Sequence, residues 1–178
     1  MSPLERQTTT AYVAVGSNIE PETHIVAALD RLRDAVIVTG ISTFYVTAPI
    51  DRPEQQDYLN GAVAVECPTG ARALKYDTLR PIEAALGRVR SADRYAARTI
   101  DLDIMLFGDL TSREPGLALP DPDLRTRPFL LAAVAELAPG YIMPDTGEPL
   151  AVLLGNAGRA QLKPAVAFTR SLRERFGL

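Results

Sequence analysis

The 178-residue sequence contains one cysteine, Cys67, and one histidine, His24. A lone cysteine cannot form an internal disulfide, so we expect a reducing compartment. Because Cys67 ends an apolar run, we interpret it as a small core residue, not a nucleophile. His24 falls on a predicted surface helix, so neither a Ser-His-Asp triad nor a His-rich zinc site is supported. No Gly-x-x-x-x-Gly-Lys-Ser/Thr motif occurs, which excludes a P-loop kinase.

Long apolar runs and a strong charge of one sign are also missing. No run approaches the roughly 18 residues that span a bilayer, and the polar residues 1–10 lack the apolar stretch of a signal peptide. The chain has 19 basic and 22 acidic residues, a formal net charge of −3, which gives no general attraction to nucleic acid or membrane. We therefore expect a cytoplasmic protein with neither of these partners. We expect a monomer, although the sequence leaves an oligomer open.

Charge is instead concentrated locally, between residues 88 and 107. Asp101 and Asp103 alternate with apolar residues as in a strand, so both carboxylates should point one way while Ile100, Leu102, Ile104 and Leu106 point into a core. Two such carboxylates can bind a pair of hard cations. Four arginines just upstream, Arg88, Arg90, Arg94 and Arg98, suit phosphate oxygens. An Asp-x-Asp paired with arginine is also a common surface feature, so this pattern alone leaves both interpretations open.

Apolar periodicity predicts the remaining elements. Strands are expected over residues 10–15, 36–46, 58–66, 100–107 and 117–119, and helices from Pro21, after Gly70 and over 124–137. The order β-α-β-β-α-β predicts an α+β fold with a mainly antiparallel sheet. The loop 47–56 and the irregular segment 91–97 are candidate functional segments. We expect a loose leader (1–9), one domain (10–155) and a tail (156–178) whose structure the sequence does not indicate.

The charged stretch also carries a family resemblance. Arg94-x-Ala-Ala-Arg98-x-x-Asp101-Leu-Asp103-Ile-Met resembles the signature of the 6-hydroxymethyl-7,8-dihydropterin pyrophosphokinase family. Further motifs fit in family order over roughly residues 11–155: Ala14-Val-Gly16-Ser17-Asn18, Phe44-Tyr-x-Thr47-x-Pro49-Ile50, Asp57-Tyr58-Leu59-Asn60, Glu83-x-x-x-Gly87-Arg88-Val89-Arg90, Leu119-Pro120, Arg127-x-Phe129 and Glu136-Leu-Ala138-Pro139. The resemblance implies a ferredoxin-like α/β/α sandwich. It also implies a diphosphotransferase of folate biosynthesis, with ATP and a reduced pterin as its small-molecule substrates and AMP as a product.

The resemblance assigns roles by position. Asp101 and Asp103 would hold two Mg²⁺, and Arg88 and Arg98 would complete the catalytic group. Binding of ATP is implied for Arg90, Ile104, Asp121 and Arg127. Binding of the pterin is implied for Thr47, Ala48, Ile50, Tyr58, Asn60, Tyr95 and Phe129. Asn60 can donate and accept hydrogen bonds at once, as an aminopyrimidinone edge requires. Surface ion pairs for the arginines, and core packing for Tyr58 and Phe129, are the plainer interpretations.

Three positions depart from the family pattern. Asp121 stands where the family usually has a histidine near nucleotide phosphate, Ser91 stands at an often basic position, and Tyr95 stands where tryptophan is common. An aspartate would repel phosphate unless it binds metal or turns away. Two alternatives therefore stay open: a catalytically weakened pterin- and nucleotide-binding paralogue, and a metal-dependent phosphohydrolase.

Overall fold

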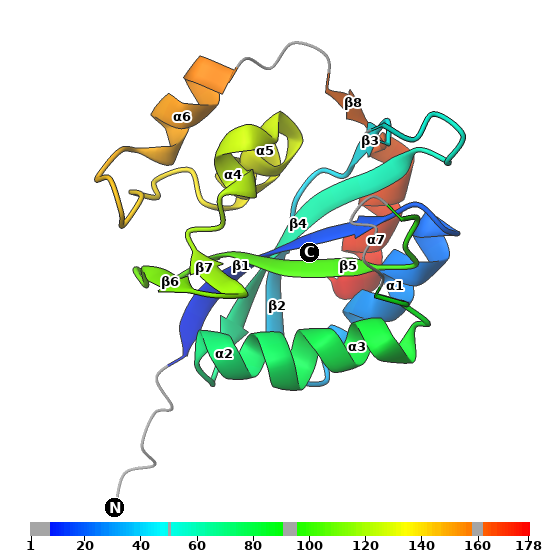
Figure 1. Cartoon of the computed structure of the whole chain (residues 1–178), viewed down its shortest axis with the longest axis horizontal. Coiled ribbons are helices and arrows are strands. Elements are labelled where there is room, and N and C mark those ends of the chain that lie inside the picture. Colours follow the sequence, from blue (N-terminus) through cyan, green and yellow to red (C-terminus); the bar gives the residue numbers. More distant parts are fainter. Residues whose placement is uncertain (1–7, 50, 91–95, 158–161) are drawn as a thin grey trace, which may run out of the picture.

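A computed structural model of the chain describes residues 8–49, 51–90, 96–157 and 162–178. Figure 1 shows its elements in chain order: β1 (Thr9–Ser17), α1 (Pro21–Leu32), β2 (Ile37–Ile41), β3 (Tyr45–Thr47), β4 (Tyr58–Cys67), α2 (Ala71–Ala73), the π-helical η1 (Leu74–Leu79), α3 (Arg80–Ala85), β5 (Asp101–Phe107), β6 (Ser112–Glu114), β7 (Leu117–Leu119), α4 (Asp123–Thr126), α5 (Pro128–Leu137), α6 (Leu150–Ala157), β8 (Lys163–Pro164) and α7 (Val166–Phe176).

One sheet organises the fold. Its strand order is β5-β1-β4-β3-β8, and β2 also pairs with β4. The strand pairs in the described part of the chain are all antiparallel. In β1 the fully buried Ala11, Val13 and Val15 alternate with less buried residues, the pattern of a strand with one face on a core. The mainly antiparallel α+β arrangement predicted from the sequence is confirmed.

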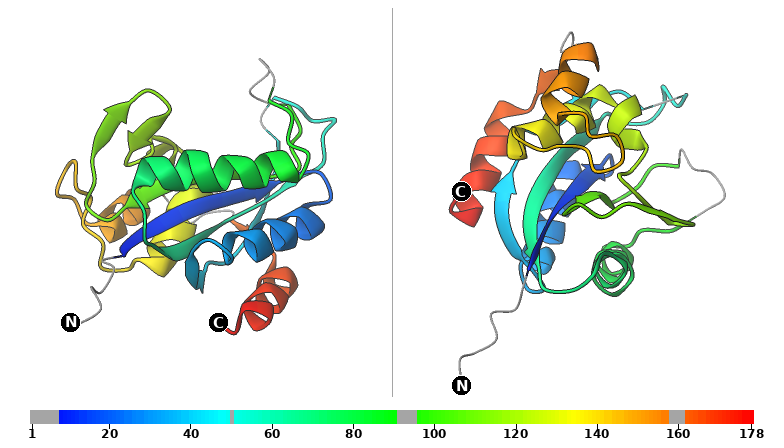
Figure 2. Two further views of the ribbon diagram at one scale, coloured as in Figure 1. Left: turned by 90° about the horizontal axis from the view of Figure 1, so that it is seen from below. Right: turned by 90° about the vertical axis from the view of Figure 1, so that its left-hand side faces the viewer.

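Helices cover both faces of this sheet. On one side, α1, the α2–η1–α3 helix and α7 pack a core that includes Ile25, Leu79 and Leu172. On the other side, α5 and its neighbours pack a second cluster around Leu131 and Val134. Figures 1 and 2 show α5 and the α2–η1–α3 helix on opposite sides of the central strands. The molecule is therefore the α/β/α sandwich that the resemblance implied.

Two elements expected to be continuous are interrupted. The strand predicted over 36–46 divides at Ser42, whose hydroxyl accepts the Ala62 N–H at 2.8 Å while the following chain turns Phe44 into the core. The helix predicted over 124–137 divides at Arg127, whose backbone is extended (φ −119°, ψ 101°). The residue before a proline avoids the helical conformation, and Pro128 then begins α5.

The side-chain alternation along β5 also changes partway. A register shift against β1 pairs Val13 with Ile104 but Tyr12 with Leu106. Leu106 consequently packs in the α5-side cluster, whereas Leu102 and Ile104 pack in the α1-side core, so the prediction of one shared apolar face was wrong for Leu106. Asp101 and Asp103 precede the shift and keep the common face that alternation predicts.

The C-terminal segment belongs to the packed structure. β8 pairs with β3, and the Phe44 N–H donates to the Thr169 hydroxyl of α7 at 3.0 Å. Arg175 of α7 and Asp30 of α1 form an ion pair at 2.6 Å. We therefore propose that residues 162–178 form one domain with the preceding chain, beyond the expected boundary at 155. Residues 1–7, most of the expected leader, lie outside the described residues.

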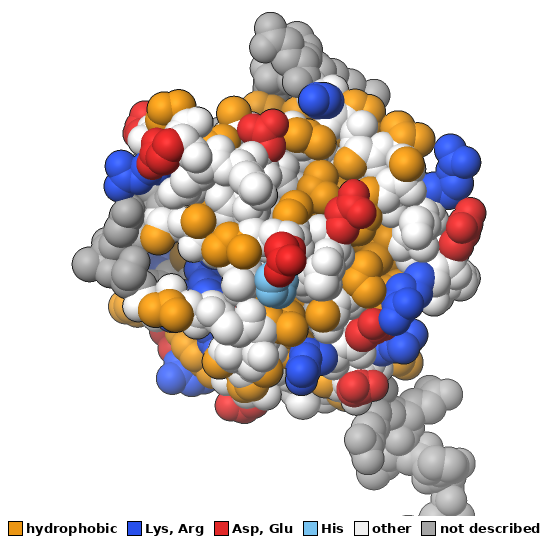
Figure 3. Space-filling view, turned by 90° about the vertical axis from the view of Figure 1, so that its right-hand side faces the viewer, with side chains coloured by type: hydrophobic (Ala, Val, Ile, Leu, Met, Phe, Trp, Pro, Cys, Tyr) orange, Lys and Arg blue, Asp and Glu red, His pale blue; other side chains and the backbone are white. Residues whose placement is uncertain are grey.

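The remaining sequence features take unremarkable positions. Cys67 is buried in the α1-side core, as predicted. The face that carries the histidine has acidic, basic and apolar side chains interspersed (Figure 3). Across the described ranges no helix combines the length and the apolar character needed to cross a membrane.

The contribution of α7 can be measured. Leu172→Ala removes a side chain that is only 1 % exposed, which should lower the free energy of unfolding by about 2–5 kcal/mol. Leu178→Ala, at an exposed terminal position, is the matched control and should have little effect. Urea denaturation checks both variants. Equal stability of the two would contradict the assignment of α7 to the domain core.

Candidate active site

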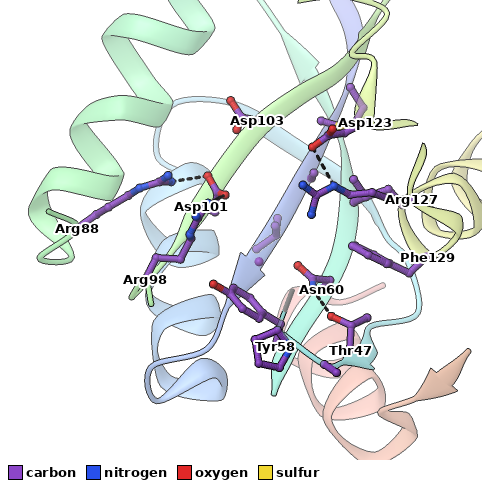
Figure 4. A pocket seen from close by; sticks show the side chains of 17 residues that line it. Thr47, Tyr58, Asn60, Arg88, Arg98, Asp101, Asp103, Asp123, Arg127 and Phe129 are labelled. Carbon is purple, nitrogen blue, oxygen red and sulfur yellow. Dashed lines mark hydrogen bonds and ion pairs between the residues drawn. The ribbon is translucent and has the colours of Figure 1, made fainter. Parts of the chain in front are cut away.

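A cavity of about 280 Å³ opens over β1, β4 and β5. Its walls come from these strands, the segment after β3, the end of the α3 region and the α4–α5 segment (Figure 4). The lining residues are Ala14, Val15, Gly16, Thr47, Ala48, Pro49, Tyr58, Asn60, Arg88, Arg98, Asp101, Asp103, Met105, Asp123, Arg127, Phe129 and Leu130. Strands therefore bring together side chains that lie far apart in the sequence.

Asp101 lies at the charged end of the cavity between two guanidiniums. Arg88 and Arg98 each donate a hydrogen bond to its carboxylate, and Arg88 also donates to the Ile100 carbonyl at 3.1 Å. Burial acts to raise the pKa of Asp101, but the two guanidiniums outweigh it and hold the pKa below its ordinary value. The group is thus an ionised carboxylate at neutral pH.

Asp103, two residues on, has a different environment. Lys75 donates to its Oδ1 at 2.9 Å, and a guanidinium nitrogen of Arg80 lies 3.9 Å from the same oxygen. Burial and the neighbouring charge of Asp101 raise the pKa of Asp103 above its ordinary value. Two carboxylates with opposite pKa shifts therefore border one cavity.

Behind both aspartates lies a buried carboxylate, Glu83, whose side chain is 2 % exposed. It accepts hydrogen bonds from Arg80 at 2.9 Å, from Arg90 at 2.5 Å and from Arg88. It also accepts the Leu102 N–H at 2.9 Å, and Leu102 lies between the two aspartates. Burial raises the pKa of Glu83 to about 7, although these donors oppose the shift. One carboxylate thus positions the arginines and the β5 backbone together.

The opposite end of the cavity carries an amide and aromatic rings. The Asn60 side-chain N–H₂ donates to the Thr47 hydroxyl at 2.7 Å, and Tyr58 and Phe129 border the same space (Figure 4). Asn60 lies opposite Gly16 on β1, and a Cβ at Gly16 would collide with the Asn60 amide oxygen. Glycine at position 16 is therefore required for Asn60 to lie where it does.

Asp121, the departure from the family pattern, does not line the cavity. Its carboxylate accepts the Asp123 N–H at 2.8 Å at the start of α4, and its own N–H donates to the Met105 carbonyl at 2.9 Å. Burial raises its pKa to about 6. The Asp121 side chain thus hydrogen-bonds to the backbone two residues further along the chain. The cavity is lined instead by Asp123, whose carboxylate forms an ion pair with Arg127 at 2.9 Å.

Most of the residues predicted for the site lie together. The cavity collects Thr47, Ala48, Tyr58, Asn60, Arg88, Arg98, Asp101, Asp103, Arg127 and Phe129. Arg90 and Ile104 do not line it: Arg90 pairs with Glu83 behind it, and the Ile104 side chain is buried in the α1-side core. Ile50 and Tyr95 lie outside the described residues.

Sequence reasoning did not include several lining residues, of which Gly16, Met105 and Asp123 are examples. It also missed Asn18, which is almost fully buried. The Asn18 side chain donates to Gln55 at 3.0 Å and accepts the Arg98 N–H at 2.8 Å. Its backbone N–H donates to the Arg98 carbonyl at 3.2 Å. Asn18 therefore ties the loop after β3 to the segment before β5; its place in the Gly16-Ser17-Asn18 turn was the available signal.

The two aspartates fit a magnesium site by their chemistry. Magnesium in phosphate-handling sites is held by one or two carboxylates together with substrate oxygens and water, not by an all-protein cage. In the described part of the chain no group of three or more His, Cys, Asp or Glu side chains converges as a metal site. Asp101 and Asp103 would thus leave coordination positions to phosphate and water.

Comparison with known proteins places this chain among the pyrophosphokinases, which are diphosphotransferases. Residues 12–139 match the family described as 7,8-dihydro-6-hydroxymethylpterin-pyrophosphokinase (HPPK). A 2-amino-4-hydroxy-6-hydroxymethyldihydropteridine pyrophosphokinase of Pseudomonas aeruginosa is 40 % identical over 138 residues, covering 75 % of this chain and 83 % of the relative. One of Bacillus subtilis is 38 % identical over 130 residues, covering 71 % and 77 %. The chain belongs to the HPPK family.

Solved structures confirm the fold. A crystal structure of Plasmodium falciparum HPPK-DHPS, a triple mutant with SDX-DHP, has a TM-score of 0.67 and 13 % identity, covering 98 % of this chain and 47 % of that one. The chain thus spans about half the length of the solved chain it matches. At this identity the likeness concerns the fold alone.

The organising role of Glu83 leads to a stability prediction. At pH 8, Glu83→Ala removes one shared acceptor from three arginines and leaves the Leu102 N–H unpaired, which should cost about 3–5 kcal/mol of unfolding free energy. Glu83→Gln keeps an acceptor for Leu102 and should cost less. Glu114→Ala breaks an exposed pair with Arg72 and should cost under about 1 kcal/mol. Chemical denaturation compares the variants, and a Glu83→Ala loss no larger than that of Glu114→Ala would refute this role.

Proposed function

We propose that this protein transfers a diphosphoryl group from ATP to the hydroxymethyl group of 6-hydroxymethyl-7,8-dihydropterin, releasing AMP, as a step of folate synthesis. The observation that carries the proposal is the division of one cavity. Paired carboxylates and guanidiniums form one end, and the Asn60 amide with two aromatic rings forms the other. Membership of the HPPK family supports these two substrates.

The aromatic end suits a flat heterocycle with a hydrogen-bonding edge. The Asn60 side chain offers both a donor and an acceptor, and Thr47 already fixes its orientation. Tyr58 and Phe129 supply apolar surface on which a ring can pack. A pterin held there directs its hydroxymethyl oxygen toward the charged end.

The charged end suits a polyphosphate. Arg88 and Arg98 share Asp101 as their partner, and a phosphate oxygen offers a guanidinium the same geometry as a carboxylate. Arg127 lies on the α4–α5 wall and reaches the same cavity. The arginines can therefore exchange a carboxylate for phosphate without leaving the site.

The proposed reaction needs no side-chain nucleophile. The hydroxymethyl oxygen attacks the β-phosphorus and loses its proton, the bond from that phosphorus to the oxygen bridging the α-phosphate breaks, and AMP leaves with the bridging oxygen. Arg88 and Arg98 would stabilise the charge that develops on the transferred group. Asp101 and Asp103 would hold Mg²⁺, which supplies further charge neutralisation when bound.

The nucleotide product tests the reaction. With ATP, Mg²⁺ and the pterin, we expect pterin-dependent AMP; dominant ADP would contradict diphosphoryl transfer, and pterin-independent hydrolysis would favour a phosphohydrolase. Asp101→Asn and Asp103→Asn should each lower turnover on the order of 10²–10³-fold, because each weakens the binding of the Mg²⁺ that would neutralise charge in the transition state. Asp109→Asn, exposed just beyond β5, is the control. Tight binding of both substrates without AMP would identify the weakened paralogue.

Pterin recognition is tested separately. Asn60→Ala leaves a buried polar edge of the pterin unpaired, at a cost of about 1–3 kcal/mol, roughly 5- to 150-fold in affinity. ATP affinity should stay unchanged, and calorimetric titration measures both. Gly16→Ala should weaken pterin binding in the same direction by displacing Asn60, whereas Gly70→Ala, where a Cβ meets no atom within 4 Å, should not. Equal losses for both ligands would rule out a pterin-specific role.

A further inference from the structure

Lys75 is a buried cation for which the proposed mechanism has no use. It lies on η1, facing the edge strand β5, and its side chain is only 10 % exposed. Its ammonium group donates to Asp103 Oδ1 at 2.9 Å. A lysine is seldom buried without a partner, and here the partner is one of the two cavity carboxylates.

The backbone irregularity of the helix explains how Lys75 reaches that position. The Arg80 N–H donates to the Lys75 carbonyl, a bond across five residues that defines a π-turn. In an α-helix, residues five apart point about 140° away from each other, so they lie on different faces of the helix. The wider π-turn brings them onto one face, and both cationic groups approach Asp103 Oδ1. Single π-turns of this kind often accompany functional sites.

The surroundings of Asp103 show what this contact does. Its neighbours include two further carboxylates, those of Asp101 and Asp121, whose charges repel it. Arg80 is 3.9 Å away and partly turned to Glu83, so the Lys75 ammonium is the close hydrogen-bond donor to this carboxylate among the contacts described. Lys75 and Arg80 both approach Oδ1, and within the described residues no hydrogen bond or ion pair involves Oδ2.

We propose that Lys75 is a positioning residue for metal binding, which orients the Asp103 carboxylate so that its second oxygen faces the cavity. The inference rests on the proposed function, because it takes Asp103 as a ligand of Mg²⁺. Partners that hydrogen-bond a metal-ligating group from behind fix its orientation, and their removal costs 10–100-fold in metal affinity or activity. The charge of Lys75 alone would act the opposite way, by repelling the cation, so the sign of the effect separates orientation from simple electrostatics.

Three variants separate these effects. Lys75→Met keeps the length and apolar stem of the side chain while removing its charge and donor; the Asp103 side chain is 32 % exposed and keeps the Arg80 guanidinium 3.9 Å away, which limits the cost of losing one partner of the pair. Lys75→Arg keeps both charge and donor. Lys163→Met changes the exposed lysine of β8 and is the matched control. Thermal melting of each variant verifies folding.

The first measurement is the affinity for Mn²⁺, a probe for Mg²⁺, which electron paramagnetic resonance reports with α,β-methylene-ATP present. The second is the Mg²⁺ dependence of AMP formation. Lys75→Met should bind Mn²⁺ 10- to 100-fold more weakly and need correspondingly more Mg²⁺ for half-maximal rate. Lys75→Arg should recover part of this affinity, and Lys163→Met should match the wild type.

The outcomes that overturn the proposal are distinct. Unchanged or tighter Mn²⁺ binding by folded Lys75→Met would mean that Lys75 does not orient Asp103. A lower melting temperature with unchanged Mn²⁺ affinity would mean a structural role only. If Asp103→Asn itself left Mn²⁺ binding unchanged, the proposed metal role of Asp103 would fail, and the inference about Lys75 with it.

Discussion

The charged half of the cavity depends on one buried group, the Glu83 carboxylate. It binds guanidiniums from the start of α3 and from just beyond its end and, through the Leu102 N–H, holds the strand between the two cavity aspartates. Burying an ionisable group is costly unless its hydrogen-bonding capacity is filled, and here four donors fill it. The relative placement of Asp101 and Arg88 is therefore set by a third residue that does not line the cavity.

The sequence predicted those parts of the site that depend on neighbouring residues, and it did not predict those that depend on contacts between distant residues. Asp101 and Asp103 could be placed on one face because strand alternation is local. Lys75 could not be placed, because its role depends on a π-turn and on a strand distant in sequence. The five-residue spacing between the buried Leu74 and Leu79 was the local sign of that turn. The tail was undetermined for the same reason, since α7 is held by contacts to Phe44 and Asp30.

Asp121 illustrates a limit of reasoning by resemblance. A family motif fixes the position of a residue along the chain, but it does not fix which hydrogen bonds the side chain forms. A histidine and an aspartate differ in what they can accept, and Asp121 uses its carboxylate to accept the N–H of Asp123 at the beginning of α4. The cavity wall at this point is then shaped by the Asp123–Arg127 pair.

The hydrogen bonds of Asn18 bear on how two ligands would bind together. Through them the loop after β3, which borders the aromatic end, is bonded to the segment before β5, which carries Arg98. A ligand that immobilises one of these segments reduces the conformational freedom that the other still has to lose. Two ligands bound at the two ends would then be thermodynamically linked, and by reciprocity each would favour the other's binding by the same factor.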